Sequence, residues 1–218
     1  MQKLVDGVHA FQRAHFARHR ELFQTLAARG QNPETLFITC SDSRVVPNLI
    51  TGTDPGELFT VRNIGNMVPH PSLPGGTAAA IEYAVSILGV QNIVVCGHTD
   101  CGAVRALMSP ASVAHVPLVS KWLAQSERVR DLVEQRYAHL DSDARARAAV
   151  GENVLAQLEH LREFPFVAEP LSSGNLRLSG WVYKIETGEV FDFDPSSGQF
   201  VLMSDRHDSA APPSVSPR

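Results

Sequence analysis

Three residues that can bind a metal stand at the ends of two short apolar segments. Cys40 directly follows TLFIT at residues 35–39, and His98 ends NIVVCGH at residues 92–98, with Cys101 three residues later. Both segments predict buried strands, and because the carboxyl ends of parallel strands share one edge of a sheet, the three side chains can converge. Two thiolates and an imidazole are typical zinc ligands, and three protein ligands leave a fourth position open. The sequence therefore predicts one zinc ion per chain.

A carboxylate and a guanidinium accompany the first of these ligands. Asp42 lies two residues beyond Cys40, close enough to accept a hydrogen bond from a metal-bound water, and Arg44 can hold that carboxylate with two hydrogen bonds. Asp42 could instead bind the metal and fill the fourth position, with Arg44 as the latch. Cys101 would lie in the first turn of a helix, where backbone N–H groups favour an anion, so we expect its thiol to lose a proton readily.

Each of these residues also has an ordinary structural interpretation. Cys40 alone would be a small buried hydrophobic residue, His98 could cap a strand or helix, and Cys101 could fill a gap between a helix and the sheet. Their combination with Asp42 favours a site. The third cysteine, Cys96, lies within a strand and is expected in the core. Its spacing from Cys101 is not that of a C-x-x-C pair, which disfavours a thiol oxidoreductase.

The surrounding pattern predicts the elements that position the site. Residues 1–30 are expected to form a helical arm, because apolar residues recur at helical spacing until Gly30. A second strand is expected at 58–63 and a helix at 75–89, before the strand at 92–98. A strand, a helix and a strand within about thirty residues form the βαβ unit of a parallel sheet. We predict an α/β fold with a mostly parallel central sheet flanked by helices.

The C-terminal half adds helices and a hairpin. Residues 117–163 have a helical pattern with a break at 139–143, and residues 176–195 alternate polar and apolar residues around a turn, which predicts a C-terminal β-hairpin. We expect a single domain over residues 1–203 and a disordered tail over 204–218, since the last stretch is rich in Ser, Pro and Ala.

Composition argues against several classes of protein. The chain of 218 residues is 44% hydrophobic, which is enough for one core, and its net charge of −4 with scattered basic residues disfavours nucleic acid as a partner. No apolar stretch reaches the roughly 20 residues that span a membrane, and the N-terminus does not resemble a signal peptide. Three cysteines do not make a disulfide framework, so we expect a cytoplasmic protein.

Four motifs carry a resemblance to a known family: CSDSR at 40–44, RNIGNMVP at 62–69, AAIEYAV at 79–85 and GHTDCGA at 97–103. Together they resemble the β-class carbonic anhydrases, and the match extends from the helical arm to the final hairpin. Bacterial members associated with cyanate operons are the most similar, through PETLFITCSDSRVVP and SGWVYKIETG. The resemblance implies reversible hydration of CO₂ to bicarbonate and a proton.

The resemblance also implies roles for particular residues. Cys40, His98 and Cys101 match the zinc ligands, and Asp42 and Arg44 match the catalytic dyad. It implies a homodimer or a dimer of dimers, with a substrate pocket built across the dimer interface. The residues that match the lining of that pocket are Gln31, Phe59, Ile64, Tyr83 and the backbone of Gly102. An apolar wall with one or two donors suits a small uncharged substrate, and Gln31 and the Gly102 amide would be the donors.

The sequence departs from one feature of the family. Some members bind a second, inhibitory bicarbonate that moves the aspartate onto zinc, using a Trp, an Arg and a Tyr. Here Arg62 and Tyr183 match, but Phe37 stands at the Trp position and lacks the indole N–H donor. We therefore predict that this inhibitory site is absent or weak and that Asp42 normally pairs with Arg44.

Two other functions remain open at this point. A zinc enzyme of the same fold could hydrolyse COS or CS₂, because these linear molecules react with the same nucleophile. Alternatively, the zinc could be structural in a non-catalytic binding or assembly module, although Asp42, Arg44 and an open fourth position count against it.

Overall fold

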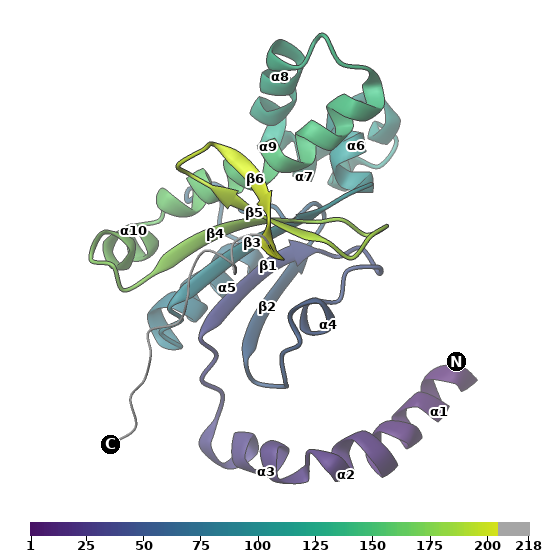
Figure 1. The fold of residues 1–218 in the computed structure, drawn as a ribbon, viewed down its shortest axis with the longest axis vertical. Helices are drawn as coiled ribbons and strands as arrows, with labels where there is room; N and C mark the ends of the chain where they lie inside the picture. The colour runs from purple at the N-terminus through teal and green to yellow at the C-terminus, as the bar shows by residue number, and fades with distance from the viewer. Residues whose placement is uncertain (205–218) are drawn as a thin grey trace.

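The centre of the molecule is a twisted six-stranded sheet, shown by a computed structural model that describes residues 1–204 (Figure 1). The strands lie in the order β2-β1-β3-β4-β5-β6. Their bounds are β1 (Thr35–Cys40), β2 (Leu58–Asn63), β3 (Asn92–His98), β4 (Arg177–Tyr183), β5 (Val190–Asp194) and β6 (Gln199–Leu202). The first four strands of this order are parallel to one another, whereas β5 and β6 are antiparallel. The predicted α/β fold and C-terminal hairpin are confirmed.

The middle strands β1 and β3 are apolar along their length because helices and loops cover both of their faces. Leu36, Phe37 and Ile38 of β1 are fully buried, as are Ile93 and Val95 of β3. The register pairs Thr39 with Cys96, so that β1 and β3 end side by side. This alignment brings the residues after both strands to the same edge of the sheet.

Helices surround the sheet and form the arm. Their bounds are α1 (Gln2–Ala10), α2 (Phe16–Arg18), α3 (Arg20–Arg29), α4 (Pro47–Thr51), α5 (Gly76–Glu82), α6 (Gly102–Met108), α7 (Pro117–Leu123), α8 (Glu127–Arg136), α9 (Ser142–Arg162) and α10 (Pro165–Ser172). Short π-helical segments continue α1 and α5 at Phe11–His15 and Tyr83–Ile87, and 3-10 turns occur at Pro110–Val113 and Ala124–Ser126. The predicted break at 139–143 overlaps the connection between α8 and α9, although α9 already begins at Ser142. No helix in residues 1–204 is long and apolar enough to cross a membrane.

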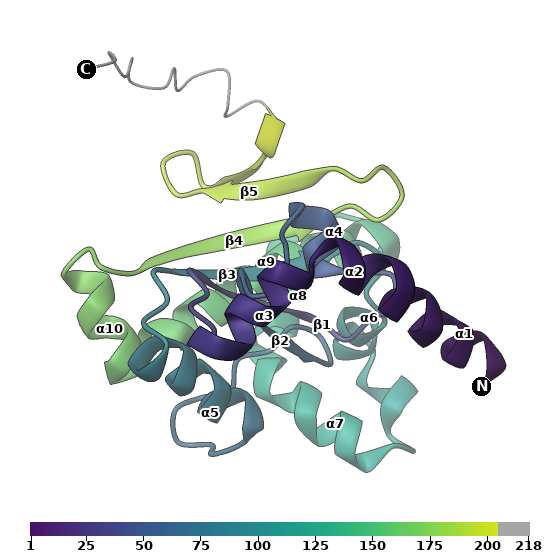
Figure 2. The same cartoon turned by 90° about the horizontal axis from the view of Figure 1, so that it is seen from below.

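The arm stands away from the sheet. Helices α1 to α3 project from the body as an extended unit (Figures 1 and 2), and none of their residues is buried. Phe11, Phe16 and Phe23 pack on one another within this unit, with ring centroids 5.4–6.3 Å apart, and the Arg20 guanidinium lies over the Phe16 ring. Leu4, Val8 and other apolar side chains of α1 remain exposed. The predicted helical arm is therefore confirmed, and it presents an uncovered apolar surface. The predicted tail at 204–218 lies outside the described residues, apart from Ser204.

Helix α9 crosses β3 and β4 closely because two glycines leave room for it. A Cβ atom at Gly97 would lie 2.8 Å from Val154 Cγ2 and 3.1 Å from Val150 Cγ1, and one at Gly180 would lie 2.9 Å from Val154 Cγ1. Val154 is itself fully buried. The close contact of α9 with the sheet thus depends on glycine, which has no side chain, at positions 97 and 180.

We predict that Gly97→Ala destabilises the fold. The new methyl group would overlap the valines of α9, so the helix would have to shift, and overpacking of this kind costs about 1–3 kcal/mol. Urea unfolding at neutral pH measures the loss. Gly7→Ala is the control, because nothing lies within 4 Å of that position in α1 and alanine favours helix. An unchanged unfolding midpoint for Gly97→Ala would contradict this description of the helix contact.

Candidate metal centre

The three predicted ligands meet at the carboxyl edge of the sheet. Cys40 ends β1, His98 ends β3, and Cys101 immediately precedes α6. Their ligand atoms all lie within 4.8 Å of one another, and the two sulfur atoms are 4.0 Å apart. All three side chains are buried. Residues separated by about sixty positions therefore form one compact donor set, as the strand pattern predicted.

The ring of His98 is oriented for metal binding. Its Nδ1 donates a hydrogen bond to the carbonyl oxygen of Thr99 over 2.8 Å, so that Nε2 is the nitrogen that faces the thiols. This Nε2 is buried and has no hydrogen-bond partner in the described structure. An unpartnered polar atom in a buried position is costly, whereas a metal ion would use its lone pair. The donor set therefore fits zinc.

The two thiols differ in acidity because they share one hydrogen bond. The Cys101 thiol donates toward Cys40, and this bond, together with His98, holds the pKa of Cys40 well below its ordinary value. The same contact and burial raise the pKa of Cys101 well above its ordinary value, because a second thiolate 4.0 Å from the first would be repelled. Our expectation of a readily ionised Cys101 was wrong for the metal-free chain. The amides of Ala103 and Val104 favour the thiolate, but Cys40 and burial outweigh them.

Asp42 and Arg44 form a tight pair beside the donor set. Arg44 donates from Nε to Asp42 Oδ1 over 3.0 Å and from Nη2 to Oδ2 over 2.8 Å, and its backbone N–H also donates to Oδ1 over 2.9 Å. These bonds hold the pKa of Asp42 well below its ordinary value. Asp42 Oδ2 lies 3.8 Å from His98 Nε2. The carboxylate is thus ionised, held by Arg44 and adjacent to the position a metal would occupy.

Arg62 supports the same loop from β2. Its Nε donates to the carbonyl oxygen of Cys40 over 3.2 Å, and its Nη2 donates to that of Asp42 over 2.8 Å. Phe37, at the position where some relatives have Trp, is fully buried against Trp181, with ring centroids 5.8 Å apart. Arg62 is therefore engaged by backbone oxygens, and Phe37 offers no donor.

Two buried amides on α9 hold the loop that follows β2, and neither was among the predicted site residues. Asn153 Nδ2 donates to Gly65 O over 3.0 Å, and Gln157 Oε1 accepts from the Val68 N–H over 2.7 Å. The two side chains also bond to each other. The Gly65 backbone in turn hydrogen-bonds to the Cys40 thiolate. Two amides four residues apart within an otherwise apolar helix face were the signal that could have identified them.

The residues predicted for the substrate pocket lie in two places. Ile64 and Gly102 directly follow β2 and Cys101, next to the metal centre, and both are exposed. Phe59 of β2 and Tyr83 pack together elsewhere, with ring centroids 6.0 Å apart, and Tyr83 is 45% exposed. Gln31 is exposed where the arm joins the body. A single chain therefore leaves Gln31 and Tyr83 exposed and Phe59 half-buried against the core, rather than assembled around the donor set.

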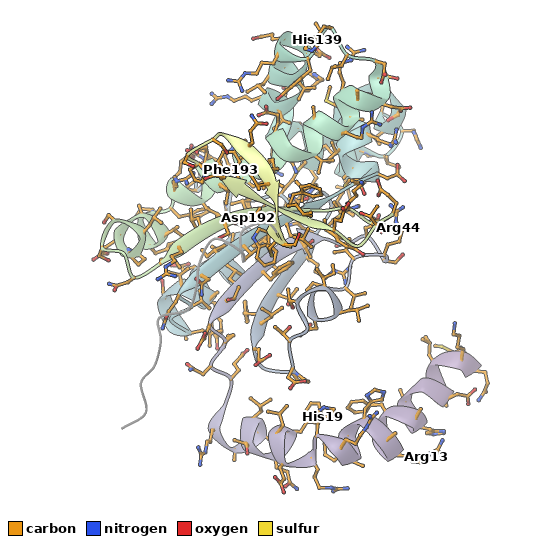
Figure 3. All side chains as sticks on the ribbon, viewed as in Figure 1. Arg13, His19, Arg44, His139, Asp192 and Phe193 are labelled. Carbon is orange, nitrogen blue, oxygen red and sulfur yellow. The ribbon has the colours of Figure 1, made fainter. Side chains whose placement is uncertain are left out.

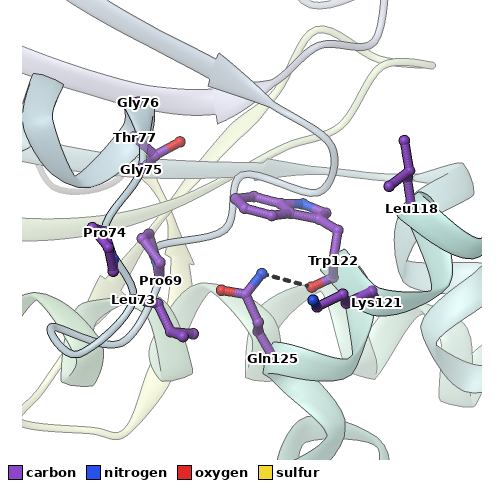
Figure 4. A pocket seen from close by; sticks show the side chains of 10 residues that line it. All are labelled: Pro69, Leu73, Pro74, Gly75, Gly76, Thr77, Leu118, Lys121, Trp122 and Gln125. Carbon is purple, nitrogen blue, oxygen red and sulfur yellow. Dashed lines mark hydrogen bonds between the residues drawn. The ribbon is translucent and has the colours of Figure 1, made fainter.

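A separate pocket lies between the loop before α5 and helix α7 (Figure 4). It is lined by Pro69, Leu73 and Thr77 on one side and by Leu118, Lys121 and Trp122 on the other. The Trp122 indole N–H donates to the carbonyl oxygen of Ile64 over 2.7 Å. None of the three ligands, Asp42 or Arg44 lines this pocket.

Comparisons with known proteins agree with the geometry. The sequence profile described as carbonic anhydrase matches residues 35–190. The carbonic anhydrase of Pseudomonas aeruginosa is 47% identical over 206 residues, covering 94% of this chain and 93% of the relative. The solved structure of the β-carbonic anhydrase CcaA superposes with a TM-score of 0.90 at 44% identity, over 93% of this chain and 98% of that one. A tetrameric β-carbonic anhydrase from Sordaria macrospora has a TM-score of 0.71 at 33% identity, with coverage of 88% and 92%. The chain belongs to the β-class carbonic anhydrase family.

Proposed function

We propose that this protein is a zinc-dependent carbonic anhydrase, which catalyses the reversible hydration of CO₂ to bicarbonate and a proton. The observation that carries this proposal is the buried cluster of Cys40, His98 and Cys101 with an ionised carboxylate at its open side. The family membership supports the same reaction. The chemistry that zinc supplies when bound is the ionisation of water near neutral pH, for which carbonic anhydrase is itself the standard example.

The chain's own residues contribute binding, orientation and charge. His98 is fixed by its bond to Thr99, so that its Nε2 faces the position that a metal would occupy. Asp42 stays ionised because Arg44 depresses its pKa, and it can therefore accept a hydrogen bond that orients the attacking water. Arg44 occupies both carboxylate oxygens, so that Asp42 remains beside the metal position rather than on it. We assign Asp42 and Arg44 as the catalytic dyad on this basis.

We further propose that the substrate pocket is completed by a second copy of the chain. Gln31, Phe59 and Tyr83 of each chain would line the site of the other, alongside Ile64 and the amide of Gly102. The exposure of Gln31 and Tyr83 and the uncovered apolar side chains of α1 support a homodimer or a dimer of dimers. The tetrameric relative from Sordaria macrospora fits the same expectation. Sedimentation of the zinc-loaded protein at micromolar concentration tests it, and a monomer would contradict it.

Several finer assignments also belong to the proposal. We place residues 1–203 in one domain and the protein in the cytoplasm, where free Cys40, Cys96 and Cys101 would stay reduced. We assign the chain to the group of β-class enzymes associated with cyanate operons on the two motifs quoted above. Because Phe37 lacks an N–H donor, we also propose that the inhibitory bicarbonate site is absent or weak. Bicarbonate at increasing concentration should then reduce turnover only by product competition.

A comparison of substrates tests the activity. Zinc-loaded protein should hydrate CO₂ rapidly and hydrolyse COS and CS₂ far more slowly, because the same nucleophile is present but the pocket would be shaped for CO₂. Stopped-flow measurements with CO₂ and hydrogen sulfide release from COS and CS₂ measure the three rates on one sample. Faster turnover of COS or CS₂ would favour the alternative hydrolase, and zinc without any turnover would favour the non-catalytic module.

A further inference from the structure

The guanidinium of Arg44 is held on two sides. Its contacts with Asp42 use Nε and Nη2, and its remaining side faces Asp100, which lies between His98 and Cys101. Arg44 Nη1 donates to Asp100 Oδ2 over 3.3 Å, and Nη2 donates to the carbonyl oxygen of Asp100 over 3.2 Å. Arg44 is labelled beyond the carboxyl ends of the parallel strands in Figure 3. Arg44, which holds Asp42, is therefore itself held by Asp100.

Asp100 is in turn fixed by a second arginine from α6. Arg105 Nε and Nη2 each lie 2.9 Å from Asp100 Oδ1, so that the two carboxylate oxygens serve different arginines. Arg105 also contacts Asp143 of α9 over 3.4 Å. The shallow pocket over this cluster is lined by Arg44, Asp100 and Arg105, together with Arg147 and Glu186. A chain of alternating charges thus runs from Asp42 outward to α9.

The backbone of Asp100 adds to this arrangement. Its φ of 55° lies in the left-handed region, which few residues other than Gly, Asn and Asp adopt readily. This conformation turns both the carbonyl oxygen and the carboxylate of one residue toward Arg44. We call these two contacts of Asp100 with Arg44 the clamp. Because Cys101 directly follows Asp100, the clamp lies on the same loop that positions a metal ligand.

We propose that Asp100 and Arg105 are positioning residues that hold Arg44 against Asp42 and so keep Asp42 off the metal. The proposal rests on the carbonic anhydrase function assigned above. The Arg44 side chain is 45% exposed, so that without Asp100 its guanidinium would be free to turn toward solvent. An Arg44 side chain that is free to turn holds the Asp42 carboxylate less firmly. Asp42 would then spend more time misoriented or on the metal, where it would displace the attacking water.

The test compares Asp100→Asn and Arg105→Gln with the wild type, all zinc-loaded. Asn keeps the shape of Asp100 and tolerates its backbone conformation, but it removes the charge that Arg44 and Arg105 share. The first measurement is the solvent exchange rate of the Arg44 Nε–H by NMR, which reports the grip on Arg44 whether or not the protein turns over. The second is kcat/KM for CO₂ across neutral to alkaline pH.

We expect Asp100→Asn to speed exchange at Arg44 and to lower kcat/KM, each by about 3- to 5-fold, because exposed ion pairs are individually weak. Arg105→Gln should act in the same direction by about 2-fold. Asp143→Asn is the matched control, since it removes one carboxylate from the same cluster without touching Arg44, and it should leave both readouts unchanged. Equal effects of Asp143→Asn and Asp100→Asn would overturn the proposal. They would indicate that the net charge of the cluster, rather than the contact of Asp100 with Arg44, determines both readouts.

Two outcomes separate this inference from the proposed function. If exchange at Arg44 and kcat/KM in Asp100→Asn both match the wild type, the clamp is wrong while the carbonic anhydrase function stands. If the wild type does not hydrate CO₂ but Asp100→Asn still speeds exchange at Arg44, the proposed function is wrong while the contact between Asp100 and Arg44 is supported. Zinc content is measured for every variant, because a lower rate caused by lost zinc would overturn a positioning role.

Discussion

Cys40→Ser loses zinc and CO₂ hydration together. A serine hydroxyl is a far weaker zinc ligand than a thiolate, and the remaining pair, His98 and Cys101, is too few to hold the ion. The loss of affinity should exceed the roughly 10- to 100-fold that follows removal of an outer hydrogen-bond partner of a zinc ligand. Zinc per chain after dialysis and CO₂ hydration by stopped flow are measured on the same preparation.

Cys96→Ser is the matched control for this result. Cys96 lies within β3, two residues before the ligand His98, but it is fully buried in the core and is not part of the donor set. Burial raises the pKa of its thiol to about 12, so it does not act as a thiolate at neutral pH. The control should keep zinc and activity. Zinc retained by Cys40→Ser, or activity lost only in Cys96→Ser, would contradict the assignment and would favour thiol chemistry.

Asp42→Asn lowers the rate without removing zinc. The amide keeps the size of the side chain, but it offers one acceptor oxygen instead of two and carries no charge for Arg44 to hold. Groups that accept or orient a proton in this way contribute about 10²- to 10⁴-fold to a rate, so we expect a loss within that range. Turnover at full zinc occupancy measures it. A variant with wild-type turnover would contradict the role of Asp42 in the dyad.

The same variant also has a defined effect on stability against pH. Because Arg44 depresses the folded-state pKa of Asp42 below its ordinary value of 3.8, the pair stabilises the fold above that pH. This contribution is lost as the pH falls from about 4 through the lower folded-state pKa. Asp42→Asn should therefore show a shallower fall in the free energy of unfolding between pH 5 and pH 2. Denaturant titrations of the metal-free proteins measure the slope, and parallel slopes would contradict a depressed pKa.

The metal centre could be predicted because the positions of its residues follow from simple rules. The buried segments that end at Cys40 and His98 predict parallel strands, and parallel strands bring their carboxyl ends to one edge. The spacing of His98 and Cys101 then leaves little freedom for the second thiol. The structure confirms this convergence, with ligand atoms within 4.8 Å.

Other features could not be predicted, because they depend on distant contacts. Asp100 reads in the sequence as a surface residue, and only the structure shows that its carboxylate lies between two arginines. The acidity of Cys101 was predicted from its helix alone, whereas the neighbouring Cys40 determines it. Strand β6 is only four residues long and was missed, since a short edge strand depends on its pairing with β5. The role proposed for Gln31, Phe59 and Tyr83 depends on contact with a second copy of the chain, which the pattern of one sequence does not describe.

The measurement that tests the central claim most directly is CO₂ hydration as a function of bound zinc. Metal-free protein is titrated with zinc, and turnover is recorded by stopped flow at each point, with zinc per chain determined on the same samples. The site predicts that activity rises linearly and stops rising at one zinc per chain, and that a chelator abolishes it. Full zinc occupancy at the three ligands without CO₂ hydration at any pH would contradict the proposed function.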